Sequence, residues 1–466
     1  MPDTDQRDRR ASVSTSRGAT FPSDPAAHPV PVPHRSHRPP SGTALSAPGP
    51  GRPGPRIGVL STYPPTQCGL ATFSAALVEH LARTSAQVGV VRVVDAPASD
   101  DTPEVVAQLV NGRPDSAAAA VHHLDAFDAV VVQHEYGIYG GPDGIDVLAI
   151  LEALTVPVVV VLHTVLQDPS TSQRAIVERL LATAQVVVTM TETARSRLLA
   201  MYAADPARLA VIPHGATVHR SPATGGLDGR VLDGRGLDGR GLDGRGLDGW
   251  GSDGSTLDSC APAGSGRRPL VLTWGLIGPG KGIEWAVDAM AGIRDLDPRY
   301  LVLGETHPKV LDRDGEAYRD GLVRRAADRG VSDLVEFDPT YLGVDELADV
   351  VARADVVLLP YDSREQVTSG VLIEAVAAGR PVVSTAFPHA VELLTDGPGL
   401  VVPQRDPTAM AAALRRVLSE PGLARELSAS ASRRAPELLW GAVATRYLRI
   451  AETLAASTNA TRTAAT

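Results

Sequence analysis

Continuous apolar runs, most of them rich in valine, recur along the first half of the sequence. They occupy residues 56–65, 88–94, 129–135, 157–164, 185–191 and 209–215. Runs of this length are typical of strands that are buried on both faces of a sheet. Amphipathic patterns with helical spacing lie between most of them, at residues 69–84, 144–154 and 191–202. This alternation predicts a parallel, doubly wound α/β sheet.

A second series of the same kind begins near residue 269. The expected strands are 269–276, 300–305, 334–337, 355–361, 381–385 and 399–403. Helical patterns separate most of these runs, including 344–354 and 406–420, and residues 422–457 show helical spacing with no further strand. The pattern therefore predicts two Rossmann-like domains in tandem.

Two stretches interrupt the pattern. Residues 1–54 are rich in Pro, Ser and Arg, and we expect a disordered tail. Residues 227–251 repeat a five-residue unit of the form LDGRG. A solenoid or a weak cation site are alternatives for this repeat, but its glycine content favours a flexible linker. The expected segments are a tail (1–54), an N-terminal Rossmann-like domain (55–217), a linker (218–268), a C-terminal Rossmann-like domain (269–432), a helical segment (433–457) and a short tail (458–466).

Composition narrows the class of protein. The 466 residues include 43% hydrophobic residues, and 44 basic and 54 acidic residues give a net charge of −10, which argues against nucleic-acid binding. The chain has two cysteines, Cys68 and Cys260, as expected in a reducing cytoplasm. We find no signal-peptide pattern and no apolar run of about 18 residues.

The loop and helix around residues 365–385 carry polar groups where a ligand would bind, beyond the carboxyl end of a strand. A helix is expected to begin near Ser369, and its free N–H groups would attract an anion, although Thr368 or Ser369 could simply cap it. Glu374 lies in an otherwise apolar stretch of that helix. A carboxylate there needs a partner, either a ribose diol or a structural cation.

A glycine-rich loop at residues 275–285 contains Lys281, one of only two lysines in the chain; the other is Lys309. The spacing does not fit a Walker loop. Glycines allow close approach to a phosphate, and a lysine in an arginine-using chain suggests a phosphate contact, with a solvated loop lysine as the alternative.

Further polar residues follow strands of the first domain. His163 and His134 end successive strands, Glu135 follows His134, and Gly69 precedes a helix start. A histidine in such a place is either structural or directed at the cleft. Glu392 is expected to begin a helix after a strand of the second domain, where it could complement the helix dipole or contact a sugar.

The sequence lacks the motifs that mark several other kinds of site. The sequence has no HExxH, paired-cysteine or DxD pattern for a metal, and no Gly-x-Ser-x-Gly elbow. It also lacks the G-x-G-x-x-G loop that a dehydrogenase would carry after its first strand.

Taken in order, several motifs resemble those of the GT-B retaining glycosyltransferases of family 4. They are the glycine loop at Gly69, "LHT" (162–164), "IPHG" (212–215), "GLIGPGKG" (275–282) and "IEAVAAGRPVV" (373–383). The resemblance covers residues 56–430 without the repeat. It implies two Rossmann-like domains that face a central cleft, and transfer of a sugar from a nucleotide-diphosphate sugar without a metal ion.

The resemblance also implies roles for single residues. Glu374 matches the second Glu of the Glu-x7-Glu motif, which binds the ribose, and Lys281 matches the lysine on the diphosphate. The N–H groups of Ser369, Gly370 and Val371 would bind phosphate. His163 would face the donor sugar and act in catalysis with Lys281 and Gln366, and Gly69 would close on the donor. His134, Glu135 and Glu392 are further candidates for acceptor or sugar contacts.

Two positions depart from the family pattern. Gln366, beside Glu365, stands where the motif's first Glu is usual, and Leu276 replaces an arginine that binds diphosphate. Arg364 is a candidate replacement. The motifs "EYGI-x-GG", "THP" and "QVTSG" indicate a subfamily. The alternative function is a nucleotide-sugar-binding GT-B protein with little or no turnover. A phosphorylase would need a lysine placed to hold pyridoxal phosphate, and neither lysine suits it.

The expected partners follow from this reading. The donor is a UDP-, GDP- or ADP-sugar, used as co-substrate with no permanently bound cofactor, and the acceptor is a glycan, a lipid-linked sugar or a small molecule. We expect a hexosyltransferase of polysaccharide biosynthesis in the cytoplasm, with peripheral contact at the inner membrane face if the acceptor is lipid-linked.

Overall fold

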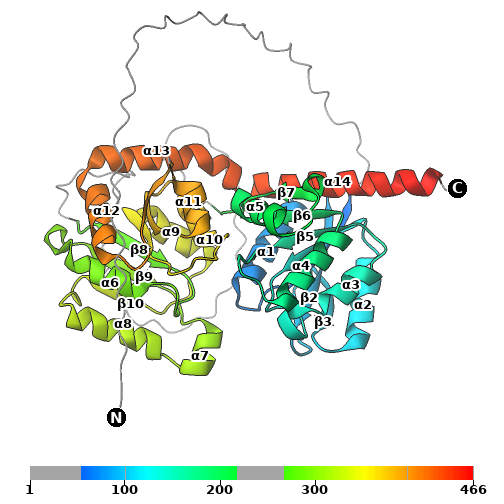
Figure 1. Cartoon of the computed structure of the whole chain (residues 1–466), viewed down its shortest axis with the longest axis horizontal. Coiled ribbons are helices and arrows are strands. Elements are labelled where there is room, and N and C mark those ends of the chain that lie inside the picture. Colours follow the sequence, from blue (N-terminus) through cyan, green and yellow to red (C-terminus); the bar gives the residue numbers. More distant parts are fainter. Residues whose placement is uncertain (1–53, 100, 218–266, 396, 465–466) are drawn as a thin grey trace, which may run out of the picture. The chain divides into compact units, whose positions relative to one another are not determined.

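The computed structural model describes residues 54–99, 101–217, 267–395 and 397–464 (Figure 1). The expected tail at 1–54 and the repeat linker at 218–268 lie almost wholly outside the described residues. All described residues belong to one unit, which contains two parallel sheets.

The first sheet has seven parallel strands in the order β3-β2-β1-β4-β5-β6-β7. Its strands are β1 Arg56–Ser61, β2 Gln87–Val94, β3 Val105–Val110, β4 Ala129–His134, β5 Val158–Leu162, β6 Val186–Thr189 and β7 Leu209–Val211. Its helices are α1 Gly69–Ala82, α2 Pro114–Leu124, α3 Val147–Ala153, α4 Thr171–Thr183 and α5 Glu192–Met201, with 3₁₀ turns η1 Pro142–Gly144 and η2 Pro206–Arg208. The apolar runs do not include β3, because this edge strand is mostly half-exposed and carries Gln108 among its valines.

The second sheet has six parallel strands in the order β10-β9-β8-β11-β12-β13. Its strands are β8 Leu270–Trp274, β9 Arg299–Leu303, β10 Val335–Asp338, β11 Val356–Leu359, β12 Val382–Thr385 and β13 Gly399–Val402. Its helices are α6 Ile283–Ala291, α7 Pro308–Asp314, α8 Ala317–Asp328, α9 Val344–Arg353, α10 Gly370–Ala377, α11 Pro388–Leu394 and α12 Pro407–Ser419, with the 3₁₀ turn η3 Arg294–Leu296. Two parallel-sheet α/β domains are thus confirmed.

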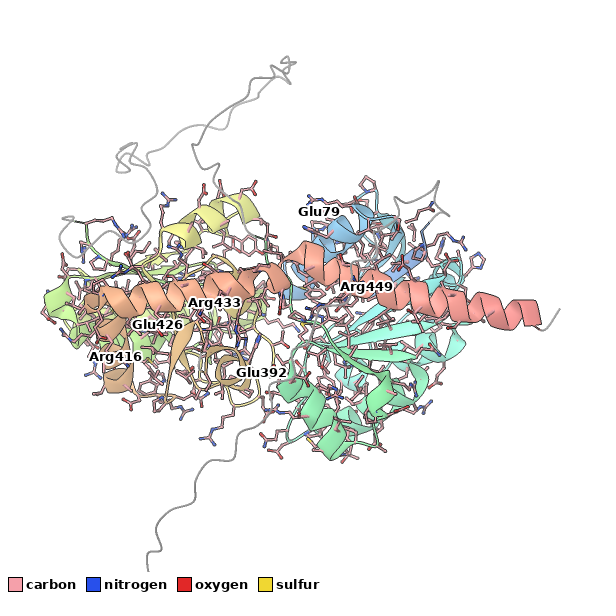
Figure 2. The ribbon with its side chains drawn as sticks, turned by 90° about the horizontal axis from the view of Figure 1, so that it is seen from above. Glu79, Glu392, Arg416, Glu426, Arg433 and Arg449 are labelled. Carbon is pink, nitrogen blue, oxygen red and sulfur yellow. The ribbon has the colours of Figure 1, made fainter. Side chains whose placement is uncertain are left out.

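Two long helices end the described chain, α13 Pro421–Leu438, which carries Arg433, and α14 Trp440–Ala464, which carries Arg449 (Figure 2). Leu439 separates them with an extended backbone. Helix α13 packs against α10 of the second domain, whereas α14 packs against α1 of the first. The boundaries expected at 432/433 and 457/458 therefore fall inside helices.

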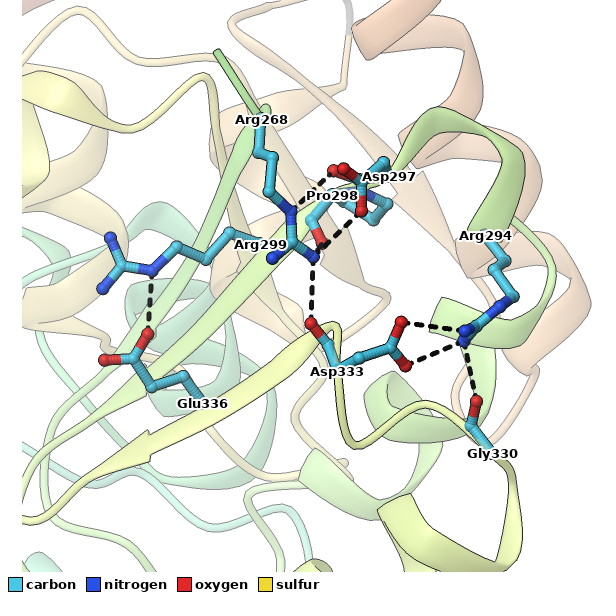
Figure 3. A network of polar contacts seen from close by, with 8 residues as sticks. All are labelled: Arg268, Arg294, Asp297, Pro298, Arg299, Gly330, Asp333 and Glu336. Atoms are coloured by element: carbon cyan, nitrogen blue, oxygen red, sulfur yellow. Dashed lines mark hydrogen bonds and ion pairs between the residues drawn. The ribbon is translucent and has the colours of Figure 1, made fainter.

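Charged side chains gather at the amino ends of the second sheet's strands (Figure 3). Arg294 donates to the carboxylate of Asp333, and Arg268 donates to the backbone carbonyl of the same residue. Arg299 pairs with Glu336 on the neighbouring strand. These charges satisfy one another at the edge opposite the carboxyl ends of the strands, so ligand-directed charge must be sought at that other edge.

Candidate functional site

The corner between β11 and α10 presents a free helix start. Ser369 caps α10, since its Oγ accepts from the N–H of Leu372 at 3.3 Å. The N–H of Ser369 donates to Nδ1 of His389 at 2.8 Å, so the expectation that this N–H serves a phosphate is corrected. The first N–H groups of a helix have no partner within the helix. The amides of Gly370 and Val371 therefore remain as the expected anion donors.

Glu374 lies on α10 with one hydrogen-bond donor. Trp274 Nε1, at the end of β8, donates to Oε2 of Glu374 at 3.3 Å. Burial raises the pKa of this carboxyl to about 7, and the Trp274 bond lowers it only in part. Sequence reasoning missed Trp274, because nothing in the local pattern singles it out. An under-satisfied carboxylate here can accept hydroxyl hydrogen bonds from a ligand.

The glycine-rich loop between β8 and α6 is held against the end of β11. Gly282 has a φ of 65°, and a Cβ built on it would lie 1.9 Å from the carbonyl oxygen of Pro360. Only glycine fits this contact and this backbone. The loop places Nζ of Lys281 4.6 Å from the ring centroid of Tyr361, and burial lowers the pKa of the lysine. A half-buried ammonium that rests on a ring is positioned to bind an anion.

His163 and Gln366 line the same cavity of about 240 Å³, together with Glu365, Val367 and Thr368 among others. Oε1 of Gln133 lies 2.7 Å from Nε2 of His163, and since an amide oxygen can only accept, that nitrogen carries the proton. Burial holds the pKa of His163 well below its ordinary value. The structure thus brings the expected donor-sugar histidine and the unusual glutamine together.

The other histidine singled out at a strand end, His134, does not line the cavity. His134 is completely buried at the end of β4, with its ring edge-on to Tyr136 at 5.2 Å. Burial lowers its pKa to about 4. Of the two roles left open for His134, complete burial favours the structural one, because the last residues of neighbouring strands need not face the same side.

Glu135 follows β4 and lies beside the cavity. It accepts from Thr164 Oγ1 at 2.6 Å, and Thr164 lines the cavity. Burial raises the pKa of Glu135, while the positive charge of Lys309 lowers it. Nζ of Lys309 lies 3.5 Å from a Cβ built on Gly137, so the second lysine also reaches this loop.

Glu392 has a structural partner. Helix α11 begins at Pro388, so this residue is not in the first turn as expected. Its carboxylate accepts from the N–H groups of Glu192 and Thr193, at 2.9 and 2.8 Å, and so complements the start of α5 rather than its own helix (Figure 2).

Glu365 also has hydrogen-bond partners in the first domain. It accepts from Arg197 at 3.0 Å and from the N–H of Gln167 at 2.7 Å. Both acidic residues thus join the first domain to the second.

Gly69 begins α1, and Sγ of Cys68 caps the helix by accepting from the N–H of Ala71 at 3.3 Å. A Cβ built on Gly69 would meet no atom within 4 Å, so the loop is open at this point.

Among the described residues, no group of three or more His, Cys, Asp or Glu side chains could hold a metal ion. No helix in that same part of the chain is both long and apolar enough to cross a bilayer.

Solved structures of known proteins share the fold of this chain. The Anabaena protein HepE, solved in complex with UDP and glucose, matches 86% of this chain and 100% of its own at a TM-score of 0.61 and 15% identity. Sucrose-phosphate synthase from Thermosynechococcus elongatus matches 86% of this chain and 100% of its own at a TM-score of 0.60 and 18% identity. At these identities the likeness shows the fold alone.

Sequence relatives carry one recurrent name. The D-inositol 3-phosphate glycosyltransferase of Kineococcus radiotolerans is 28% identical over 289 residues, which cover 59% of this chain and 58% of that protein. The protein of the same name from Frankia alni is 40% identical over 131 residues, 28% of this chain and 31% of its own. The matches span no more than 58% of either relative.

Two family models match the two halves of the chain. The model described as "Glycosyltransferase Family 4" matches residues 68–220, and the one described as "Glycosyl transferases group 1" matches residues 268–420. Together with the two parallel sheets, these matches show that the chain carries the family 4 and group 1 domains of the GT-B glycosyltransferases.

Proposed function

We propose that this protein is a retaining glycosyltransferase that moves a sugar from a nucleotide-diphosphate sugar to an acceptor without a metal ion. The observation that carries the proposal is Glu374, a carboxylate with one weak donor. Glu374 lies on α10, whose first N–H groups are free, and Nζ of Lys281 rests on the ring of Tyr361, which follows β11. A ribose diol supplies two hydroxyl donors to such a carboxylate, and a diphosphate supplies the anion for the helix start and the ammonium.

The reaction needs stabilisation of the departing nucleotide diphosphate. Lys281 and the amides of Gly370 and Val371 would supply it by electrostatic preorganisation, where a single such contact is worth about 2–4 kcal/mol. His163 and Gln366 would hold the donor sugar in the cavity that they line. Transfer with retention would proceed on one face of the sugar, with the leaving phosphate accepting the acceptor's proton.

We take UDP-glucose as the first donor to test, because HepE, a solved protein of this fold, was crystallised with UDP and with UDP-glucose. A phosphorylated cyclitol is the first small acceptor to test, because the relatives are named for D-inositol 3-phosphate. Glycans and lipid-linked sugars are the other acceptor classes. A binding protein with little turnover is the second candidate, favoured by Gln366 and Leu276 in place of the usual charged residues.

Titration calorimetry with UDP, GDP and ADP in the presence of EDTA tests donor binding. Transfer from UDP-glucose to D-inositol 3-phosphate, followed by NMR of the new anomeric centre, tests the reaction and its stereochemistry. Lys281→Ala and Glu374→Ala should each weaken nucleotide binding, whereas Arg433→Ala, an exposed change on α13, should not. Binding without hydrolysis or transfer favours the second candidate, and unchanged binding by both site variants contradicts the assignment.

A further inference from the structure

The segment that follows β7 holds a histidine in a defined orientation. His214 Nδ1 lies 2.6 Å from the backbone carbonyl oxygen of Gly215, and a carbonyl can only accept, so Nδ1 carries the proton. A Cβ on Gly215 would lie 2.1 Å from the indole of Trp440, so only glycine fits at position 215. The neutral ring therefore keeps its lone pair on Nε2.

That nitrogen lies against the start of α10. A Cβ built on Gly370 would be 2.9 Å from both Nε2 and Cε1 of His214. The rings of Phe73 and Trp440 hold the imidazole from other sides, at centroid distances of 5.0 and 5.7 Å. Among the described residues, Nε2 has no hydrogen-bond partner. The ring is packed in place while one nitrogen is left unpaired beside the expected phosphate donors.

The charges around His214 do not explain this arrangement. The titratable groups that interact with it are His163 and His389, from the end of β5 and from α11. Burial lowers the pKa of His214 to about 4, and the bond to Gly215 opposes the shift only in part. Burial also lowers the pKa of His389, to about 3. The helix start is thus lined by neutral rings, and Leu276 stands where the family pattern has an arginine.

We propose that His214 takes up a proton from solvent when a nucleotide-sugar binds, and that its imidazolium donates from Nε2 to the diphosphate at the start of α10. The histidine would then supply the positive charge that the arginine supplies elsewhere. This inference rests on the proposed function, because it requires the diphosphate to lie at this helix.

The charge of a bound diphosphate can raise the pKa of His214 far enough for proton uptake near neutral pH. With a pKa of about 4, roughly one ring in a thousand is protonated at pH 7 without ligand. One opposite charge within 4–6 Å shifts a pKa by about 1–3 units. The diphosphate of an intact nucleotide-sugar carries about two negative charges that do not titrate near neutral pH, so a shift of about three units is within reach.

Proton uptake is measured by titrating the full chain with UDP-glucose at pH 6.5 in two buffers of different ionisation enthalpy. Glu374 titrates in the same range, so the informative quantity is the proton number of the wild type minus that of His214→Gln. We expect this difference to be at least about half a proton, with about tenfold weaker binding by the variant. His214→Arg should bind well without uptake, and His123→Gln, an exposed change on α2, should match the wild type.

Equal proton numbers for the wild type and His214→Gln would overturn the role of His214. If both substitutions at 214 fail to fold, ¹⁵N spectra of wild-type imidazoles decide the point, since saturation with UDP-glucose must convert one neutral ring to imidazolium. A failure of the proposed function is distinct: UDP-glucose, GDP-mannose and ADP-glucose would then all fail to bind the wild-type protein.

Discussion

Replacing Glu374 by glutamine is expected to stabilise the folded protein above pH 7 while it weakens donor binding. The pKa of this carboxyl rises from 4.5 to about 7 because the group is buried with one hydrogen-bond donor. A raised pKa means that the folded state holds the proton more tightly than the unfolded state does. The protonated carboxyl can stay buried at little cost, whereas its ionisation destabilises the folded state. The free energy of unfolding therefore falls as pH rises from about 4.5 to 7.

The size of the effect follows from the shift. Two and a half pKa units correspond to about 3 kcal/mol, and partial solvent access to the side chain reduces this to about 1–3 kcal/mol. Glutamine has nearly the same shape, keeps an oxygen that can accept from Trp274, and does not ionise. The gain in stability should be close to its full value at pH 8 and under about 1 kcal/mol at pH 5.

Urea unfolding of the wild type and Glu374→Gln at both pH values measures this difference. Glu426→Gln, an exposed change on α13, is the matched control and should follow the wild type at both pH values. Calorimetry with UDP-glucose should show binding weaker by about tenfold to a hundredfold, because the ribose loses bonds to a charged acceptor. A stability gain that is absent at pH 8, or equally large at pH 5, would refute the reasoning.

Three further changes test other parts of the site. Lys281→Met should weaken UDP-glucose binding by about a hundredfold in calorimetry, because the ammonium has no substitute on its loop. Equal affinity would show that Lys281 does not contact the donor. Gly282→Ala should lower the unfolding free energy by about 2 kcal/mol or more in urea, since its Cβ would collide with Pro360. An unchanged midpoint would contradict that contact. Glu392→Gln should cost about 1 kcal/mol by removing a charged acceptor from the start of α5, and a loss no greater than that of Glu426→Gln would show that the carboxylate contributes nothing there.

Much of the site's polar chemistry was visible in the sequence because it departs from the surrounding pattern. Glu374 interrupts an apolar helix, and Lys281 is rare in a chain that uses arginine. Trp274 could not be found in this way, because its indole N–H becomes relevant only when β8 and α10 lie side by side. The role of His134 stayed open in the sequence for a related reason, since position at a strand end does not say which way the ring turns.

By itself, the sequence determined the two tandem α/β domains. Buried parallel strands need continuous apolar runs, and these survive as a linear pattern whatever the strand order. The tertiary structure decided the partners. No local pattern assigned Glu365 or Glu392 a partner in the first domain, yet both accept hydrogen bonds from backbone N–H groups some 200 positions away. The same holds for His214, whose contact with Gly370 depends on how the first domain packs against the second. Side-chain direction and long-range contact arise from packing, and no local pattern encodes them.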